Sequence, residues 1–274
     1  MMRPSLLAIF AHPDDEAFTS GGTLAHYARL GVDVHLICLT RGEVGKINDP
    51  ALGHVTDVGT LREGELQEAC RHMGIHPPIF LDYHDSGRGD RLQHHNPKAS
   101  INADLLEIEG KILDVIQKVQ PQVLITFDPH GGYGHPDHLV IQRATLGAFF
   151  RSGTVSDQVC RLFYTARSAE SWKRILGSNP RISSEGLDPD IYGVSEATLA
   201  VRMQVQAYAE QKMAAILAHR SQTGPQSAFA QRQAEIAASG WLTQESFSLG
   251  GVRGTIPHYP LHGLFDGLNF QDLV

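Results

Sequence analysis

Apolar runs and helical spacings alternate along the first 150 residues. Continuous apolar runs at 6–11, 34–39, 79–81 and 123–127 predict short, fully buried strands. Between them, apolar residues recur every three or four positions, as at Leu66, Ala69 and Met73. That spacing predicts helices over 23–30, 58–73, 105–119 and 139–150, and Gly31 and Gly74 follow two of them, where a left-handed residue ends a helix.

Strands without polar alternation, separated by amphipathic helices, indicate a parallel sheet that is covered on both faces. We therefore expect one α/β domain over residues 1–274, a Rossmann-like, mostly parallel sheet with helices on both faces. Its core is expected to end near residue 167, and a helical and loop extension covers 168–274.

The extension has weaker patterns. Residues 159–165 alternate more and predict a later strand near an edge of the sheet, while Gly, Ser, Pro and Asp between 177 and 193 indicate a loop. Helices are expected over 195–219 and 226–238. The Gly- and Pro-rich tail, 250–274, is expected to wrap the surface.

Composition excludes some classes of partner. A formal charge of −7, with no basic run, argues against nucleic acid and anionic membrane surfaces. No segment approaches the roughly 20 apolar residues that a spanning helix needs. The three cysteines show no CxxC spacing and fit a reducing compartment, so we expect a cytoplasmic protein that acts on a small molecule and that can form a homo-oligomer.

Two dense polar clusters follow two of the predicted strands. Ala-His-Pro-Asp-Asp-Glu occupies 11–16, and His-Pro-Asp-His occupies 135–138. Parallel strands place their carboxyl ends at one edge of the sheet, so His12, Asp15 and His138 are expected to converge there. Two imidazoles and one carboxylate make a catalytic zinc site with an open position for water, although Fe²⁺ or another divalent ion also fits these ligands.

The remaining polar residues of the clusters can move protons. Asp14 is predicted to be the general base, and its alternative role is a helix N-cap. His135 could donate a proton to the leaving amine or stabilise an oxyanion, and Asp137 could hold that imidazole in one tautomer. We interpret ten other histidines, His219 among them, as ordinary residues without a matching carboxylate.

Over residues 5–150 the sequence resembles the zinc-dependent deacetylases related to N-acetylglucosaminyl-phosphatidylinositol de-N-acetylase, the LmbE-like family. The resemblance rests on the two clusters, on Gly-Gly-Thr at 21–23, interpreted as the entry to a helix, and on Leu-Thr-Arg-Gly-Glu at 39–43, with a weaker echo at 218–222. Segments 42–47, 85–87 and 131–134 resemble the branch that acts on precursors and conjugates of the mycothiol and bacillithiol type.

The resemblance implies zinc on His12, Asp15 and His138, and the same proton-transfer roles. It also implies that Tyr133 is a mobile hydroxyl over the substrate carbonyl and that Arg62 and Asp85 hold sugar hydroxyls. Each of these three residues could instead have a purely structural role: a loop cap for Tyr133, a solvated helix face for Arg62 and a plain turn for Asp85.

The expected activity is hydrolysis of the N-acetyl group of an N-acetylglucosamine-containing small molecule. Three alternatives stay open: an amidase of thiol-sugar S-conjugates, a non-haem iron oxygenase built on the same three ligands, and a sugar-binding protein without catalysis. The loops at 84–103 and 177–193 are expected to decide between acetyl and conjugate substrates.

Overall fold

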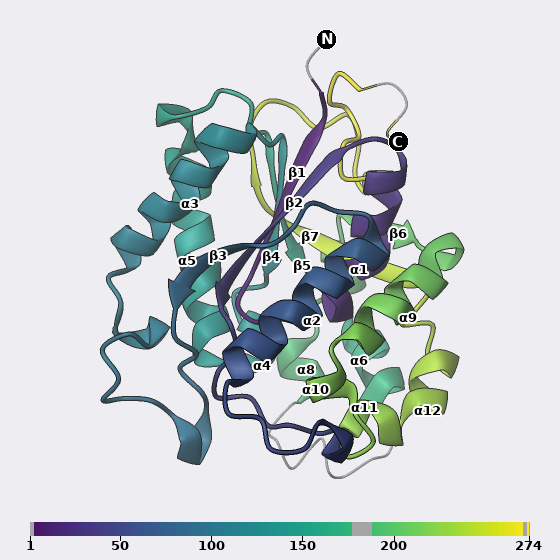
Figure 1. Ribbon diagram of the computed structural model, residues 1–274. Helices are drawn as coiled ribbons and strands as arrows, with labels where there is room; N and C mark the ends of the chain where they lie inside the picture. Colours follow the sequence, from purple (N-terminus) through teal and green to yellow (C-terminus); the bar gives the residue numbers. More distant parts are fainter. Residues whose placement is uncertain (1–2, 177–187, 271–272, 274) are drawn as a thin grey trace.

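The computed structural model describes residues 3–176, 188–270 and 273, and its centre is one seven-stranded sheet (Figure 1). The strand order is β3-β2-β1-β4-β5-β7-β6. β1 to β5 are parallel, and β7 runs antiparallel to both β5 and β6. The strands are β1 (Ser5–Phe10), β2 (Asp33–Thr40), β3 (Ile79–Tyr83), β4 (Val123–Phe127), β5 (Arg161–Thr165), β6 (Val201–Gln204) and β7 (Gln244–Val252).

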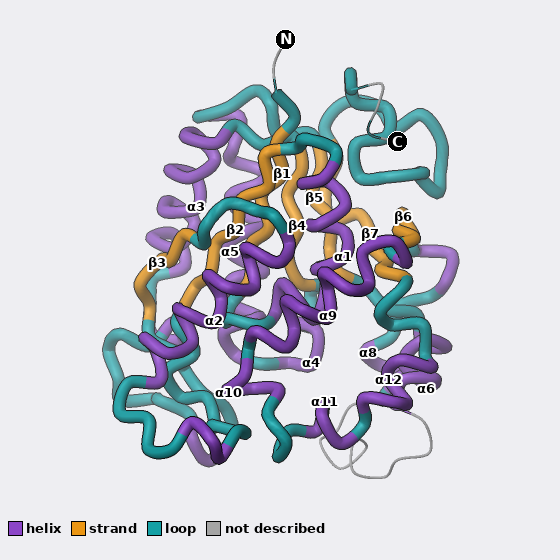
Figure 2. The backbone as a smooth tube through the Cα atoms, turned by 45° about the vertical axis from the view of Figure 1, so that its right-hand side comes forward, coloured by secondary structure: helices purple, strands orange, loops and turns teal. Residues whose placement is uncertain are grey.

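Helices cover the sheet on both sides. α3 and α5 pack together on one side, and α1, α2 and α9 pack together on the other (Figures 1 and 2). The α-helices are α1 (Asp15–Arg29), α2 (Val58–Met73), α3 (Leu105–Val119), α4 (Gly131–Gly134), α5 (Pro136–Arg151), α6 (Ala169–Leu176), α8 (Pro189–Tyr192), α9 (Ala209–Ala218), α10 (Arg220–Thr223), α11 (Ala228–Gln231) and α12 (Gln233–Ala238). The predicted α/β class is confirmed.

The order of the strands decides where the site lies. β1 pairs with β4, with Leu6 opposite Val123 and Ala8 opposite Ile125, although about 120 residues separate them in sequence. On one side of β1 the chain moves out through β2 to β3, and on the other side through β4 to β5. The crevice at this switch point, beyond the carboxyl ends of β1 and β4, is where open α/β sheets bind ligands.

Local sequence signals fix several helix ends. Asp57 caps α2 by accepting a hydrogen bond from the backbone N–H of Thr60, and Gly74 ends the helix in the left-handed conformation. Asp104 caps α3 in the same way through Leu106 N–H. Among the described residues, no helix is both long enough and apolar enough to cross a membrane.

α1 begins at Asp15, eight residues before the predicted start at residue 23. The prediction was wrong because Gly21 and Gly22 were interpreted as the approach to a helix, whereas they lie inside it. A Cβ on Gly22 would lie only 2.7 Å from the Cβ of Val205, so glycine permits α1 to pack closely against the C-terminal half. α5 likewise begins at Pro136 instead of residue 139, which places His138 in its first turn.

The C-terminal half contributes to the sheet instead of only extending from it. The helix expected over 195–219 is reduced to α9, preceded by β6, in which Val201 and Met203 are buried and Arg202 and Gln204 are exposed. This period of two is a strand pattern that the helical interpretation missed. β7 was also missed, and it lies beside β5, so the strand predicted near an edge is an inner strand. The helix expected over 226–238 is split into α11 and α12.

The tail beyond β7 packs into the protein instead of only wrapping it. Leu261, Leu264 and Phe265 are buried, and the ring of Phe265 lies 5.1 Å from that of Tyr27 in α1. The backbone N–H of Leu264 donates a hydrogen bond of 2.7 Å to the hydroxyl of Tyr27, which is fully buried. This bond ties the tail to the helix that carries Asp15.

Replacing Tyr27 with Phe tests this attachment. The substitution leaves the N–H of Leu264 buried without its acceptor, so the free energy of unfolding should fall by about 1–3 kcal/mol. Chemical denaturation measures the change, with Tyr208→Phe, a partly exposed tyrosine nearby, as the control that should stay within about 0.5 kcal/mol of the parent. Equal stability of Tyr27→Phe and the parent would contradict the described packing of the tail.

Candidate metal centre and active site

Both polar clusters lie at the carboxyl ends of β1 and β4, as predicted. The chain leaves β1 through His12 and Pro13 and enters α1 at Asp15. Asp14, between them, has φ of 126°, a conformation that side chains other than glycine rarely adopt and that costs about 1–3 kcal/mol. On the other side, the glycine-rich turn α4 leads into α5, whose first turn carries Asp137 and His138.

Donor atoms of three side chains converge at this place, and both carboxylate oxygens of Asp15 take part. Nδ1 of His12 lies 3.2 Å from Nε2 of His138 and 3.6 Å from Oδ2 of Asp15, and Nε2 of His138 lies 3.4 Å from Oδ1 of Asp15. Ligands at about 2.0–2.1 Å from a tetrahedral zinc ion lie roughly 3.3 Å from one another. The spacing of the three donors therefore fits a zinc ion, and all three side chains are buried.

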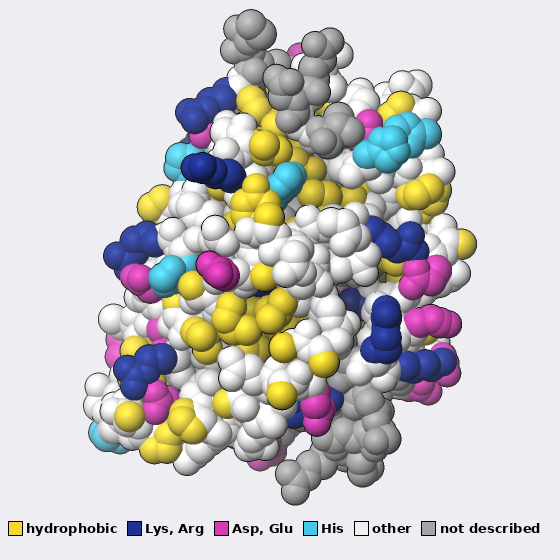
Figure 3. All heavy atoms as spheres, turned by 90° about the vertical axis from the view of Figure 1, so that its right-hand side faces the viewer, with side chains coloured by type: hydrophobic (Ala, Val, Ile, Leu, Met, Phe, Trp, Pro, Cys, Tyr) yellow, Lys and Arg dark blue, Asp and Glu magenta, His cyan; other side chains and the backbone are white. Residues whose placement is uncertain are grey.

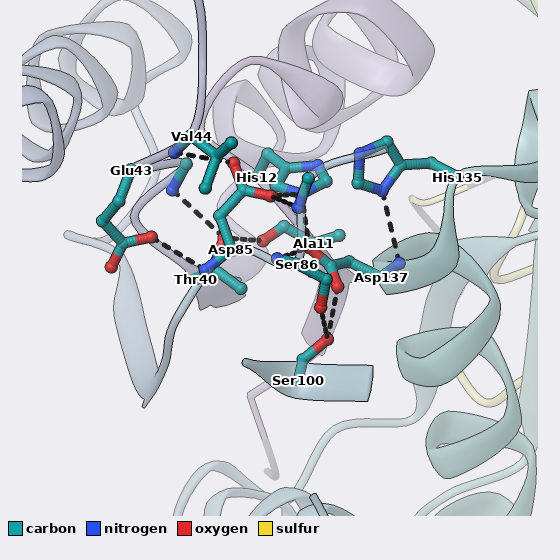
Figure 4. Close-up of polar contacts among 12 residues, drawn as sticks. Ala11, His12, Thr40, Glu43, Val44, Asp85, Ser86, Ser100, His135 and Asp137 are labelled. Atoms are coloured by element: carbon teal, nitrogen blue, oxygen red, sulfur yellow. Dashed lines mark hydrogen bonds and ion pairs between the residues drawn. The ribbon is translucent and has the colours of Figure 1, made fainter. Parts of the chain in front are cut away.

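In both His12 and His138, the ring nitrogen that does not face the other donors already has a hydrogen-bond partner. Nε2 of His12 lies 3.0 Å from Oδ2 of Asp137, and Nδ1 of His138 lies 3.0 Å from the carbonyl oxygen of Gly131 (Figure 4 shows His12 and Asp137). Carboxylates and carbonyls in these positions fix the tautomer that leaves the other nitrogen free for a metal. The ring of His138 also stacks on Phe127 at 4.0 Å.

The surrounding charges favour metal ligation as well. Burial lowers the pKa of His138 to about 4, so its imidazole is neutral, as a ligand must be. Burial opposes ionisation of Asp15, but its electrostatic contacts with the imidazoles of His138 and His12 outweigh burial and hold the pKa of Asp15 well below its usual range. Burial also acts against charge on His12, yet the hydrogen bonds that its ring donates to Asp137, Asp15 and Asp85 raise its pKa above the usual value, so a metal at Nδ1 would replace a proton.

Asp14 stands beside the donors without capping the helix. It occupies the N-cap position of α1, but its side chain makes no capping hydrogen bond, which removes the alternative considered from sequence. Its Oδ2 lies 3.2 Å from Nη2 of Arg62. Burial raises the pKa of Asp14 to about 7, although the charge of Arg62 opposes the shift.

Arg62 is not on a solvated helix face, because only 3% of the residue is exposed. Its guanidinium donates to the carbonyl oxygens of Gly42 and Pro13 in addition to Asp14. Arg62 thereby joins α2 to the turn that carries the donor residues.

His135 lies next to the three donors, with its ring 4.6 Å from that of His12. Burial, followed by the charges of His12 and His138, lowers the pKa of His135 to about 3. The backbone N–H of Asp137 donates to Nδ1 of His135, so Nε2 carries the proton. The expected role of the Asp137 carboxylate is corrected here: it contacts His12, not His135, because α5 begins at residue 136 and turns that side chain inward.

The loop over 84–103 supports Asp137 and Asp85. Asp137 accepts hydrogen bonds from the backbone N–H of Ser86 and from the hydroxyl of Ser100 (Figure 4). Asp85 is buried, accepts from the backbone N–H groups of Gly87 and Val44, and lies 3.5 Å from Nε2 of His12. Asp85 is thus more than a plain turn residue, and it also faces the adjoining cavity.

Two cavities meet at this centre. A polar one of about 260 Å³ is bordered by Lys46, Asn48, Arg62, Asp85, Gly87, Arg88, Arg91, His135 and Gln222. An apolar one of about 390 Å³ is bordered by side chains of α1, α6, α11 and α12. Asp14, Asp15 and Tyr133 border both cavities. Tyr133 sits in the turn α4, 38% exposed, with its ring 5.0 Å from that of His138.

A pair of residues that the sequence interpretation missed lies behind Asp14. His219, fully buried, has its Nε2 2.8 Å from Oε1 of Glu16, and Oε2 of Glu16 accepts a hydrogen bond of 3.1 Å from the backbone N–H of Asp14. His219 was wrongly interpreted as lacking a carboxylate partner. The available signals were Glu16, which ends the first cluster, and the echo at 218–222.

Replacing Asp137 with Asn tests the metal centre. The variant weakens the contact that orients His12, so zinc affinity should fall about 10- to 100-fold. A competition titration with a zinc-binding dye measures this, and Asp57→Asn, at the N-cap of α2, is the matched control that should bind zinc like the parent. Undiminished affinity in Asp137→Asn would contradict the role of Asp137 in orienting His12 for the metal.

Comparisons with known proteins show to which family the chain is similar. Residues 7–149 match the family model for GlcNAc-PI de-N-acetylase (PIG-L). A 1D-myo-inositol 2-acetamido-2-deoxy-alpha-D-glucopyranoside deacetylase of Mycobacteroides abscessus is 35% identical over 79% of this chain and 81% of its own, and its namesake from Streptomyces avermitilis is 33% identical over 91% and 93%. The structure of N,N'-diacetylchitobiose deacetylase from Pyrococcus horikoshii shares the fold, with a TM-score of 0.59 at 19% identity over 89% of this chain and 83% of that one. The chain therefore belongs to the GlcNAc-PI de-N-acetylase (PIG-L) family.

Proposed function

We propose that this protein is a zinc-dependent hydrolase that removes the N-acetyl group from an N-acetylglucosamine-containing small molecule, of the type 1D-myo-inositol 2-acetamido-2-deoxy-α-D-glucopyranoside. The observation that carries the proposal is the convergence of His12, Asp15 and His138, whose donor atoms lie 3.2–3.6 Å apart, with Asp14 and His135 beside them. The names of the two relatives supply the substrate.

The polar cavity supports an amino-sugar substrate. Asp85 offers carboxylate oxygens, and Arg62, Arg88 and Arg91 offer guanidinium groups, which are the groups that bind sugar hydroxyls. On the face of the protein shown in Figure 3, the Lys and Arg side chains of the described residues are interspersed with Asp and Glu and do not form a continuous basic patch. That distribution favours a small molecule over nucleic acid.

His12, Asp15 and His138 would hold the zinc ion, which lowers the pKa of its water to about 7 and polarises the acetyl oxygen when bound. The carboxylate of Asp14 takes a proton from the attacking water and then gives it to the leaving nitrogen, and the salt bridge with Arg62 keeps that carboxylate in place. His135, neutral and protonated at Nε2, donates a hydrogen bond to the developing oxyanion instead of acting as the acid. Tyr133 borders the same space and can donate its hydroxyl to the carbonyl.

The proton-transfer groups also favour hydrolysis over the alternatives. An iron oxygenase needs the three ligands but has no use for the base that Asp14 supplies. A binding protein without catalysis has no need for the raised pKa of Asp14 or the strained backbone that positions it. We also propose a cytoplasmic location, which the buried free thiols of Cys38 and Cys70 support.

Asp14→Asn and His135→Ala test the catalytic roles. Each variant should lose on the order of 10²-fold or more in turnover of the acetamido-sugar inositol, while its zinc content stays at that of the parent. Amine release and elemental analysis of the same samples provide the two measurements. Full turnover by Asp14→Asn would refute its role as base, and loss of zinc from either variant would assign that residue to the metal.

Substitution of His219 tests whether its contact with Glu16 positions the general base, Asp14. His219→Leu removes the donor to Glu16 and frees the backbone at Asp14, so kcat should fall about 10- to 100-fold without a change in KM or zinc content. His219→Gln keeps an N–H donor and should recover most of the activity. Tyr27→Phe is the control for an effect of lower stability alone, because it should lower the free energy of unfolding and leave kcat unchanged. If His219→Gln and His219→Leu lose the same activity, the contact with Glu16 does not position Asp14.

A further inference from the structure

The apolar cavity beside the metal centre is larger than an acetyl group requires. Its volume is about 390 Å³, and it opens directly onto Asp14, Asp15, Tyr133 and His138. A cavity of about 150 Å³ is enough to hold benzene. The methyl of an acetyl group is smaller than benzene, so an acetamide would leave most of this cavity without substrate.

The wall of the cavity is aromatic. Phe18 in α1 lies 5.6 Å from the rings of both Phe229 in α11 and Trp241, and the latter two are 7% and 8% exposed. Phe127, Trp172, Ala228 and Ile236 add further apolar surface.

Two of the polar side chains on this wall already have partners in the protein. The hydroxyl of Thr19 donates to the carbonyl oxygen of Asp15, and the guanidinium of Arg167 lies 5.5 Å from the ring of Trp241 and 5.6 Å from that of Trp172. Thr165 and Arg232 complete the polar part of the wall. The surface left for a ligand suits a hydrocarbon group.

The position of the two cavities selects which part of a substrate enters each. An amide is planar and trans, so its nitrogen substituent and its acyl substituent point away from the carbonyl in opposite directions. With the sugar in the polar cavity and the carbonyl at the metal centre, the acyl substituent points into the apolar cavity. We propose that this cavity is an acyl-binding site and that the enzyme hydrolyses amino-sugar amides whose acyl group is a larger apolar one than acetyl; this inference rests on the proposed function.

The proposed hydrolysis forms and breaks the same bonds as deacetylation. Water adds its oxygen to the amide carbon, the C–N bond breaks, both protons of the water go to the leaving nitrogen, and the products are a carboxylate and the amino sugar with a protonated amine. The acyl chain takes no part in bond changes, so its burial supplies only binding. Each fully buried methylene contributes about 0.8 kcal/mol, which corresponds to about a fourfold increase in kcat/KM.

The test is a series of glucosaminyl-inositol amides with acetyl, butyryl, hexanoyl and octanoyl groups, assayed on the zinc-loaded enzyme by release of the common amine. We expect kcat/KM to rise at least tenfold from acetyl to hexanoyl. Ala228→Trp, which fills the cavity, should lower the ratio of hexanoyl to acetyl rates at least tenfold, and Ile236→Trp is the second variant if the first does not fold. Ala238→Trp, exposed on the same helix as Ile236, is the control that should leave the ratio unchanged.

The outcomes separate this proposal from the proposed function. Hydrolysis of the acetyl compound with rates that fall steadily along the series would overturn the acyl site and leave the deacetylase standing. Unchanged ratios in both filling variants, despite native melting temperatures, would also overturn it. Absence of hydrolysis for every amide would overturn both proposals.

Discussion

The parallel pairing of β1 with β4 is the constraint on which the site depends. His12 and Asp15 follow one strand and His138 follows the other, so only neighbouring strands with the same direction can bring their donor atoms within 3.2–3.6 Å. The pairing is stabilised by the most deeply buried part of the core, since Leu6, Leu7 and Ala8 and the opposite residues of β4 are fully buried. The strand pairing that stabilises the sheet therefore also fixes the geometry of the donors.

A second layer of contacts gives each donor its orientation. His12 is held by Asp137, which is held by Ser86 and Ser100, and His138 is held by the carbonyl of Gly131. The unfavourable backbone of Asp14 persists because Glu16 binds its N–H and His219 binds Glu16. His219 comes from the last third of the chain, which makes the C-terminal half a structural part of the site as well as of the sheet.

The sequence was sufficient for those features that depend on local pattern. Buried parallel strands read as continuous apolar runs, and the two polar clusters stand directly after such runs, so the α/β class and the meeting of His12, Asp15 and His138 could be predicted. Features that depend on contacts between distant segments could not. Gly22 was interpreted as the approach to a helix until Val205 was seen against it, and Asp137 could not be assigned to His12 without knowing that α5 begins at residue 136.

The same limit applies to the C-terminal half. β6 is only four residues long, too short for its alternation to stand out from the surrounding helical spacing, and β7 contains Gly250 and Gly251, which are unfavourable in isolated strands. They fit because the rings of Tyr164 and Phe149 occupy the space that their side chains would need. Segment 177–187, part of a loop expected to influence substrate choice, lies outside the described residues.

The central claim is that one divalent ion binds among His12, Asp15 and His138. Diffraction from crystals of the zinc-loaded protein, recorded on both sides of the zinc absorption edge, locates the ion directly. The account predicts an anomalous peak about 2.0–2.2 Å from Nδ1 of His12, a carboxylate oxygen of Asp15 and Nε2 of His138. A strongest peak elsewhere, such as at the surface group of His258, His262 and Asp266, with none among the three donors, would contradict it.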